Sequence, residues 1–271
     1  MSNSNSKGRT LVNALGIPGI LLMIWMGDLY FTAFMTVVIF MSLREFYTMY
    51  NSKGIYPSIL MGSVATLFFI WFYHNEPYLN MLAFLQLFFA FMVLLLLFEM
   101  FSKKVNPASN ISYTLFGIAY IPMLLGTLIA LRQIDSQYDT YYTLSIFLGV
   151  WICDSAAFGF GVKWGNKKIF PRISPKKSIV GSVAGFISVL ALFHVLPHFH
   201  IPSDHFSFQD VVAFSITTGI FGQLGDFVES MFKRDVGVKD SGSFLLGHGG
   251  VLDRFDSLIL AAPLTYFYLL F

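Results

Sequence analysis

Runs of apolar residues follow one another along the whole chain, and only short polar links separate them. A bilayer core about 30 Å thick needs about 20 mostly apolar residues in a helix, because no backbone group can stay unpaired in lipid. The runs lie at 10–27, 29–47, 56–74, 79–101, 112–131, 140–162, 178–198, 209–232 and 255–271. We therefore predict an all-α, polytopic integral membrane protein with about nine transmembrane helices.

The basic residues predict how these helices are oriented, because Lys and Arg are enriched in cytoplasmic loops. If the N-terminus is cytoplasmic, every Lys and Arg except Arg132 falls on the cytoplasmic side. The two longest cytoplasmic segments are then 163–177 and 233–254. We expect a multi-pass protein of the cell (inner or plasma) membrane, with an active site that faces the cytoplasm at these two segments.

Composition supports the membrane and excludes other classes of protein. The 271 residues are 56% hydrophobic, 18% aromatic and only 12% charged, which does not describe a water-soluble surface. The net charge of +2 is too small for a nucleic-acid partner. Cys153 is the one cysteine, so an intramolecular disulfide is excluded.

Carboxylates inside the apolar runs indicate a functional region, because a charge at the membrane centre costs at least about 2.5–3.5 kcal/mol. Asp154 lies in the sixth run, and Asp226 and Glu229 lie three residues apart in the eighth, with Lys233 one turn further along. Pairing among these groups could simply fix helix packing. However, the polar stripe continues into a dense polar segment, and function explains that density better: Arg234, Lys239, Asp240, Ser241, Gly242, His248, Gly249, Gly250, Asp253, Arg254 and Asp256.

This mixture of side chains suits metal-assisted phosphate chemistry. Carboxylate oxygens without a Cys or His cluster favour Mg²⁺, which is usually held by one or two carboxylates together with substrate phosphates. Neighbouring basic residues would neutralise a polyphosphate, and the glycines allow the backbone to approach phosphate oxygens. We expect phosphoryl or nucleotidyl transfer.

A second basic cluster, Arg172-Ile-Ser-Pro-Lys-Lys-Ser178, joins the sixth and seventh runs. Ser174 and Pro175 suit a helix start, where Lys176, Lys177 and free backbone N–H groups could hold an anion. An ordinary positively charged membrane flank would look similar. The C-terminal segment shifts the interpretation towards phosphate binding.

The two segments together resemble the signature of the phosphatidate cytidylyltransferase (CDP-diacylglycerol synthase) family. The resemblance is carried by Ser230-x-x-Lys-Arg-x-x-x-x-Lys-Asp-x-Gly, followed by Gly-His-Gly-Gly-x-x-Asp-Arg-x-Asp256. Asp154 and the Ser-Pro-Lys-Lys stretch extend it over about 150–257. Residues 1–140 would then be a scaffold with dimer contacts, and residues 141–271 the catalytic region.

The resemblance implies transfer of CMP from CTP to phosphatidate, a membrane lipid, with release of pyrophosphate by a homodimer. It also implies Mg²⁺, with K⁺ as a candidate second cation, held by Asp226 and Asp253. Basic residues would take the remaining phosphate charge, and Asp240 and Asp256 would be further ligands or would orient basic side chains. The predicted catalytic residues are Asp226, Asp253, Lys233, Arg234, Lys239, Asp240, His248, Arg254 and Asp256. The predicted substrate-binding residues are Ser174, Lys176, Lys177, Ser241, Gly242, Gly249, Gly250, Asp154 and Glu229.

Two positions depart from the family pattern, and two other functions stay open. Val180 stands where relatives usually have Glu, and Phe158 where many have Tyr, so nucleotide affinity at this loop could be weaker. A CTP-dependent polyprenol kinase would share the membrane helices, CTP and metal but would transfer the γ-phosphoryl group. An ion or proton transporter could also use intramembrane carboxylates, although it would not need the glycine-rich loops.

Overall fold

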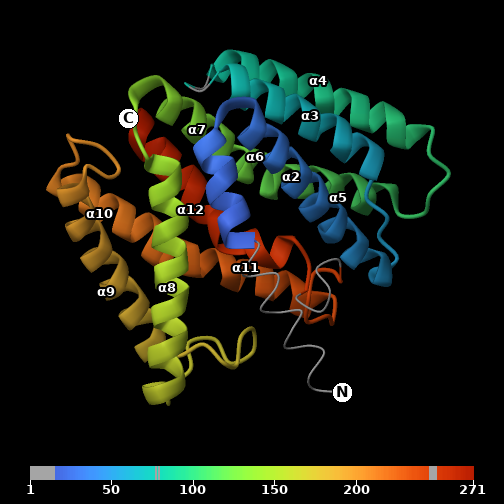
Figure 1. The fold of residues 1–271 in the computed structure, drawn as a ribbon. Helices are drawn as coiled ribbons and strands as arrows, with labels where there is room; N and C mark the ends of the chain where they lie inside the picture. The colour runs from blue at the N-terminus through green and yellow to red at the C-terminus, as the bar shows by residue number, and fades with distance from the viewer. Residues whose placement is uncertain (1–15, 77, 79, 244–248) are drawn as a thin grey trace. The chain divides into compact units, whose positions relative to one another are not determined.

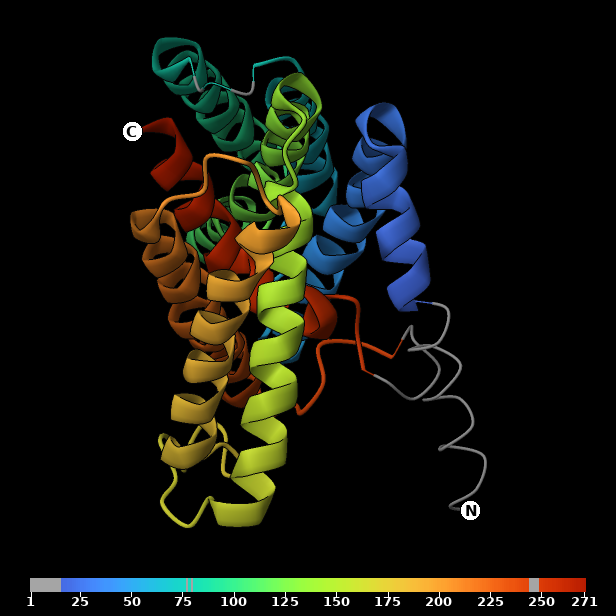
Figure 2. The same cartoon turned by 60° about the vertical axis from the view of Figure 1, so that its left-hand side comes forward.

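A computed structural model describes residues 16–76, 78, 80–243 and 249–271 of the chain. Within those ranges the structure is helical, and its one β-type pairing is an isolated bridge between Lys168 and Ser178. Among the described residues, helix lies within each of the nine predicted apolar runs, and residues 10–15 and 79 of those runs lie outside the described ranges. Figures 1 and 2 show these helices from two directions.

The helix bounds follow the apolar runs closely in the first half of the chain. After a helix over Gly16–Met26 come α2 (Asp28–Tyr50), α3 (Ile59–Asn75), α4 (Met81–Met100), α5 (Pro107–Tyr120), α6 (Pro122–Leu125) and α7 (Thr127–Tyr138). The run predicted as one helix over 112–131 is thus divided among three. Pro122 explains the first break, because proline has no N–H to continue the helix of α5.

The second half of the chain contains α8 (Tyr142–Trp164), α9 (Ile179–Val195), α10 (Phe208–Ile216), α11 (Gly222–Asp235) and α12 (Leu252–Leu270). Short 3-10 turns follow α2 and α9, over Asn51–Lys53 and Leu196–Phe199. A π-helical segment, Thr217–Phe221, joins α10 to α11, so the helix is continuous over the predicted run 209–232. Such segments are rare and are not signalled by apolar periodicity.

Six helical segments of the described residues are long and apolar enough to cross a membrane: Asp28–Lys53, Leu82–Met100, Pro107–Tyr138, Tyr142–Trp164, Ile179–Phe199 and Phe208–Asp235. Gly16–Met26 and Ile59–Asn75 are shorter apolar helices. The ninth predicted run is α12, whose first turns carry Asp253, Arg254 and Asp256. The protein is therefore all-helical and of the polytopic membrane class, and the count of nine crossings and their orientation stay predictions.

The chain forms two compact units, residues 1–133 with 236–253 and residues 134–235 with 254–271. In the first unit, α2, α3 and α5 meet around the buried Tyr47, whose hydroxyl donates to the Thr114 carbonyl oxygen at 2.7 Å. Gly62 and Gly117 make room for the Tyr47 ring, because a Cβ on either would lie within 3.0 Å of it. Three helices are thus fixed by one aromatic side chain.

In the second unit, α8 and α9 lie side by side over most of their length (Figures 1 and 2). Small residues allow this approach: a Cβ on Gly181 would lie 2.5 Å from the Ala157 carbonyl oxygen, and one on Gly185 would lie 2.9 Å from Cys153 Sγ. Cys153 is buried in this contact. The close packing fixes α8 against the start of α9, where the predicted basic cluster lies.

Candidate active site

An ion pair between Lys177 and Asp226 is the centre of the polar cluster in the second unit. Lys177 precedes α9, whose first turn is capped by Ser178, because the Ser178 hydroxyl accepts from the Gly181 N–H at 3.2 Å. The Lys177 ammonium also lies 4.7 Å from the centre of the Phe227 ring. The predicted basic cluster and the predicted carboxylate stripe therefore meet.

Two further carboxylates belong to this cluster. Asp154 on α8 interacts electrostatically with Lys177 and Asp226. Asp256 on α12 interacts with Asp226, Asp154, Lys177 and Lys233. Residues from α8, α11, α12 and the loop before α9 thus converge, although they are up to about a hundred positions apart in the sequence.

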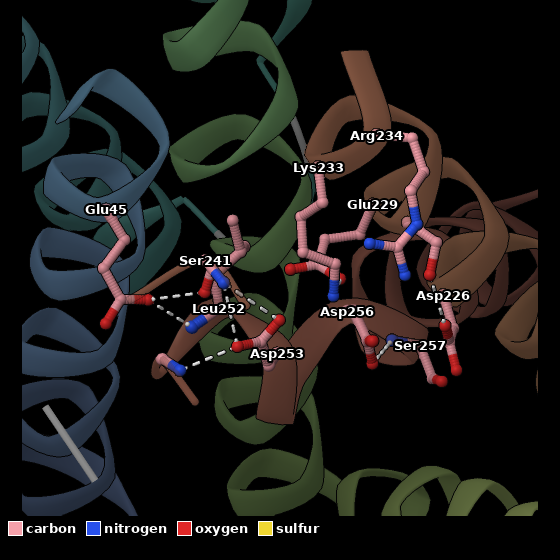
Figure 3. Close-up of polar contacts among 12 residues, drawn as sticks. Glu45, Asp226, Glu229, Lys233, Arg234, Ser241, Leu252, Asp253, Asp256 and Ser257 are labelled. Carbon is pink, nitrogen blue, oxygen red and sulfur yellow. Dashed lines mark hydrogen bonds and ion pairs between the residues drawn. The ribbon is translucent and has the colours of Figure 1, made fainter. Parts of the chain in front are cut away.

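Glu229 and Lys233 form a buried ion pair along one face of α11, with side-chain exposures of 0% and 9%. Their spacing of four residues places the two groups one helical turn apart. Figure 3 shows both side chains beside Asp256. Glu229 therefore compensates the buried ammonium, and the Lys233 charge also acts on Asp256.

The loop before α9 is tied to the end of α11. Arg234 donates through Nε to the Ile173 carbonyl oxygen at 3.2 Å, and the Ser174 N–H donates to Phe170 at 2.9 Å. Lys168 donates through Nζ to the carbonyl oxygen of Lys176 at 3.4 Å. The Lys176 side chain itself is exposed. This loop is thus held in place while Lys176 stays accessible.

The glycine-rich motif lies in the first unit, where backbone N–H groups hold Asp253. The Ser241 N–H donates to Asp253 Oδ2 at 3.0 Å, and the Gly250 N–H donates to the same oxygen at 2.7 Å. Gly249 has φ 85°, a left-handed conformation that favours glycine. The described part of the motif, 249–253, therefore folds back on its own carboxylate at the start of α12.

Glu45 on α2 is the residue that the sequence analysis missed. Its carboxylate accepts hydrogen bonds from the Ser241 hydroxyl at 3.0 Å and from the Val251 and Leu252 N–H groups at 2.9 Å each (Figure 3). A carboxylate within the apolar run 29–47 was the available signal, of the same kind that identified Asp154. Nothing in the sequence pattern connects Glu45 to a motif about two hundred residues later.

The other predicted residues differ in their exposure to solvent. Lys239, Asp240 and Arg254 are exposed. Gly242 lies against Glu45. His248 is outside the described residues, so its predicted role stays a prediction.

The donor chemistry of the second unit fits a hard divalent cation. Asp154, Asp226, Glu229 and Asp256 supply four carboxylates, whereas Lys177 and Lys233 supply two ammonium groups. In the part of the chain that the structure describes, no group of three or more His, Cys, Asp or Glu side chains forms a ready metal cage. Mg²⁺ bound together with substrate phosphates needs only one or two protein carboxylates, so these residues are suited to it.

Comparison with known proteins identifies the family of the chain. The model of the cytidylyltransferase family matches residues 7–271, which is nearly the whole chain. A phosphatidate cytidylyltransferase of Bacillus subtilis is 35% identical over 180 residues, which cover 65% of each chain. The phosphatidate cytidylyltransferase of Staphylococcus saprophyticus is 33% identical, over 95% of this chain and 96% of that relative. The phosphatidate cytidylyltransferase of Synechocystis is 31% identical, over 96% of this chain and 95% of that relative. The chain therefore belongs to the cytidylyltransferase family.

Proposed function

We propose that the protein is a phosphatidate cytidylyltransferase, which transfers CMP from CTP to phosphatidate and releases pyrophosphate. The observation that carries the proposal is the meeting of Lys177, Asp226, Asp154 and Asp256 in one charged cluster, contributed by the loop before α9 and by α8, α11 and α12. Relatives that match almost the full chain bear this name. The cluster holds three carboxylates and one ammonium, so it suits an anionic nucleotide and lipid phosphate only together with a bound cation such as Mg²⁺.

In the proposed reaction, a phosphate oxygen of phosphatidate forms a bond to the α-phosphorus of CTP. The bond between the α-phosphorus and the oxygen bridging to the β-phosphate breaks, and pyrophosphate leaves with that electron pair. The phosphate monoester is already largely a dianion near neutral pH, so no strong general base is required. Catalysis then consists of positioning and charge neutralisation.

The chain's own residues supply those two contributions. Lys177 is held by Asp226 and the Phe227 ring, so its ammonium is fixed before substrate arrives. Lys176 is exposed beside it and is available to an incoming phosphate. Preset positive charge stabilises developing negative charge without reorganisation.

Mg²⁺ is part of the proposal, with Asp226 and Asp253 as the predicted ligands and K⁺ as a candidate second cation. When bound, Mg²⁺ would neutralise charge on the nucleotide phosphates and on the leaving pyrophosphate.

The proposal also includes a homodimer and a cytoplasmic active site. Cross-linking in membranes tests the first, and labelling of cysteines introduced at Lys53 and Arg132 tests the second.

The deciding experiment uses purified protein in detergent with CTP, phosphatidate and Mg²⁺. We expect CDP-diacylglycerol and pyrophosphate, and we expect Asp226→Asn to lose most of the activity while it remains folded. Release of CDP with a polyprenol acceptor would instead support the kinase. Absence of any CTP-dependent product from the unaltered protein would defeat the enzyme assignment.

A further inference from the structure

Glu45 binds the glycine-rich loop at three points on its carboxylate. Oε2 accepts from the Ser241 hydroxyl and the Leu252 N–H, and Oε1 accepts from the Val251 N–H. Leu252 begins α12, so the carboxylate lies at the end of a helix where N–H groups have no partner within the helix. Hydrogen bonds to a carboxylate are stronger than those between neutral groups, and the helix dipole adds to them.

The same loop carries Asp253, the predicted metal ligand. Ser241 contacts both carboxylates: its hydroxyl donates to Glu45, and its N–H donates to Asp253. Gly250 donates its N–H to Asp253, whereas the next two N–H groups donate to Glu45. The two carboxylates therefore share one backbone segment, and Glu45 fixes the groups that orient Asp253 (Figure 3).

Two glycines of the motif are shaped around Glu45. A Cβ on Gly242 would lie 2.6 Å from Glu45 Oε1 and 3.0 Å from its Cγ, and every atom that it would meet within that range belongs to Glu45. A Cβ on Gly250 would clash first with Ser241 Oγ and then with Glu45, whose Cδ would lie 2.6 Å away. The sequence analysis explained these glycines by the approach of phosphate, and the structure gives them a second reason within the chain.

We infer that Glu45 is a positioning residue for the reaction. Glu45 acts through Ser241 and the 250–252 backbone to hold the Asp253 carboxylate in its observed orientation. Glu45 touches no reacting atom in this account. The role in catalysis rests on the proposed function, whereas the role in ordering the loop does not. The test therefore measures the loop and the activity separately.

The first measurement is hydrogen–deuterium exchange of peptides covering 249–253, in protein reconstituted into lipid discs. Glu45→Gln removes the charge and one acceptor oxygen. We expect exchange at these amides to rise about tenfold or more, because hydrogen bonds to a charged acceptor are stronger than hydrogen bonds to a neutral one. Glu99→Gln is the matched control, because Glu99 is a buried carboxylate of the same unit whose hydrogen bond, at 2.9 Å, comes from Asn110 on α5. Equal exchange in Glu45→Gln and the unaltered protein, or an equal rise in Glu99→Gln, would overturn the inference.

A second pair of variants tests the steric fit without relying on charge. Gly242→Ala should speed loop exchange in the unaltered background, because the new methyl group meets Glu45. In a Glu45→Ala background the same substitution should add less than twofold, because the clashing side chain is gone. An equal effect of Gly242→Ala in both backgrounds would show that Glu45 does not shape this loop.

The catalytic part is tested by the Mg²⁺ dependence of CDP-diacylglycerol formation. For Glu45→Gln we expect the Mg²⁺ concentration at half-maximal rate to rise at least about fivefold, while KM for CTP stays within twofold. Loss of kcat alone, with unchanged Mg²⁺ dependence, would limit Glu45 to a structural role. If the unaltered protein makes no CDP-diacylglycerol, the proposed function fails, but both exchange experiments still decide whether Glu45 orders the loop.

Discussion

Gly225 on α11 faces the first turns of α12, and it directly adjoins Asp226. A Cβ at this position would lie 2.5 Å from the carbonyl oxygen of Asp256 and 3.3 Å from Ser257 Cα. Non-bonded carbon contacts are most favourable near 3.5–4.0 Å, so Gly225→Ala must move one helix by roughly 1 Å. That movement shifts Asp226 and Asp256, whose charges interact in the cluster, relative to each other.

The expected effect on activity is large compared with the effect on folding. A misplacement of about 1 Å in a preorganised site can cost on the order of 100-fold in rate, whereas overpacking of this kind costs about 1–3 kcal/mol of stability. We therefore expect kcat/KM for CDP-diacylglycerol formation to fall on the order of 100-fold in Gly225→Ala. Thermal unfolding followed by intrinsic fluorescence would show that the variant is folded at the assay temperature.

Gly222→Ala is the control, because it lies one turn earlier on the same helix. A Cβ at Gly222 would be 3.6 Å from Val150 Cγ2 and 3.8 Å from the Ser257 carbonyl oxygen, which are ordinary contacts. This variant should stay within about twofold of the unaltered protein. The reasoning is refuted if Gly225→Ala, at matched stability, is as active as Gly222→Ala.

Three further predictions concern a buried pair, an atypical position and the first unit. Glu229→Gln should lower the free energy of unfolding by about 3–5 kcal/mol, because it leaves the Lys233 ammonium buried without its charged partner. In thermal unfolding, the double variant with Lys233→Met should recover part of this loss. If the double variant is less stable than either single one, the pair is not the cause. Val180 is 40% exposed in the first turn of α9, so the fold should tolerate Val180→Glu. Glu is the usual residue at this position in the family that the sequence resembles, so the substitution should lower KM for CTP. A raised KM would contradict this prediction. Tyr47→Phe should cost about 1–3 kcal/mol in unfolding and leave KM for CTP unchanged, since it removes only the buried hydrogen bond to Thr114; an altered KM would argue against separate roles.

The helices could be predicted because each membrane-crossing helix needs a long run of apolar residues. The segment 140–162, for example, coincides with α8 to within two residues at each end. The breaks within 112–131 and the π-helical segment depend on backbone hydrogen bonds that hydropathy does not report. Pro122 was a readable signal for one of these breaks.

The sequence predicted which residues belong to the candidate site better than it predicted which of them contact one another. Intramembrane carboxylates and flanking lysines identified Asp154, Asp226 and Lys177, and the structure brings these three together. Glu229 and Lys233 were predicted only as members of one polar stripe, and the structure pairs them across one helical turn. Glu45 could not be connected to Asp253 in this way, because their relation depends on tertiary folding across most of the chain.

The central claim is that the α-phosphorus of CTP, and not the γ-phosphorus, is transferred to a lipid phosphate. Parallel reactions with α-labelled and γ-labelled CTP, phosphatidate and Mg²⁺ test it directly. The account predicts that the α-label enters the chloroform-soluble lipid while the γ-label is recovered in pyrophosphate. Recovery of the γ-label in lipid, with the α-label left in CDP, would contradict it.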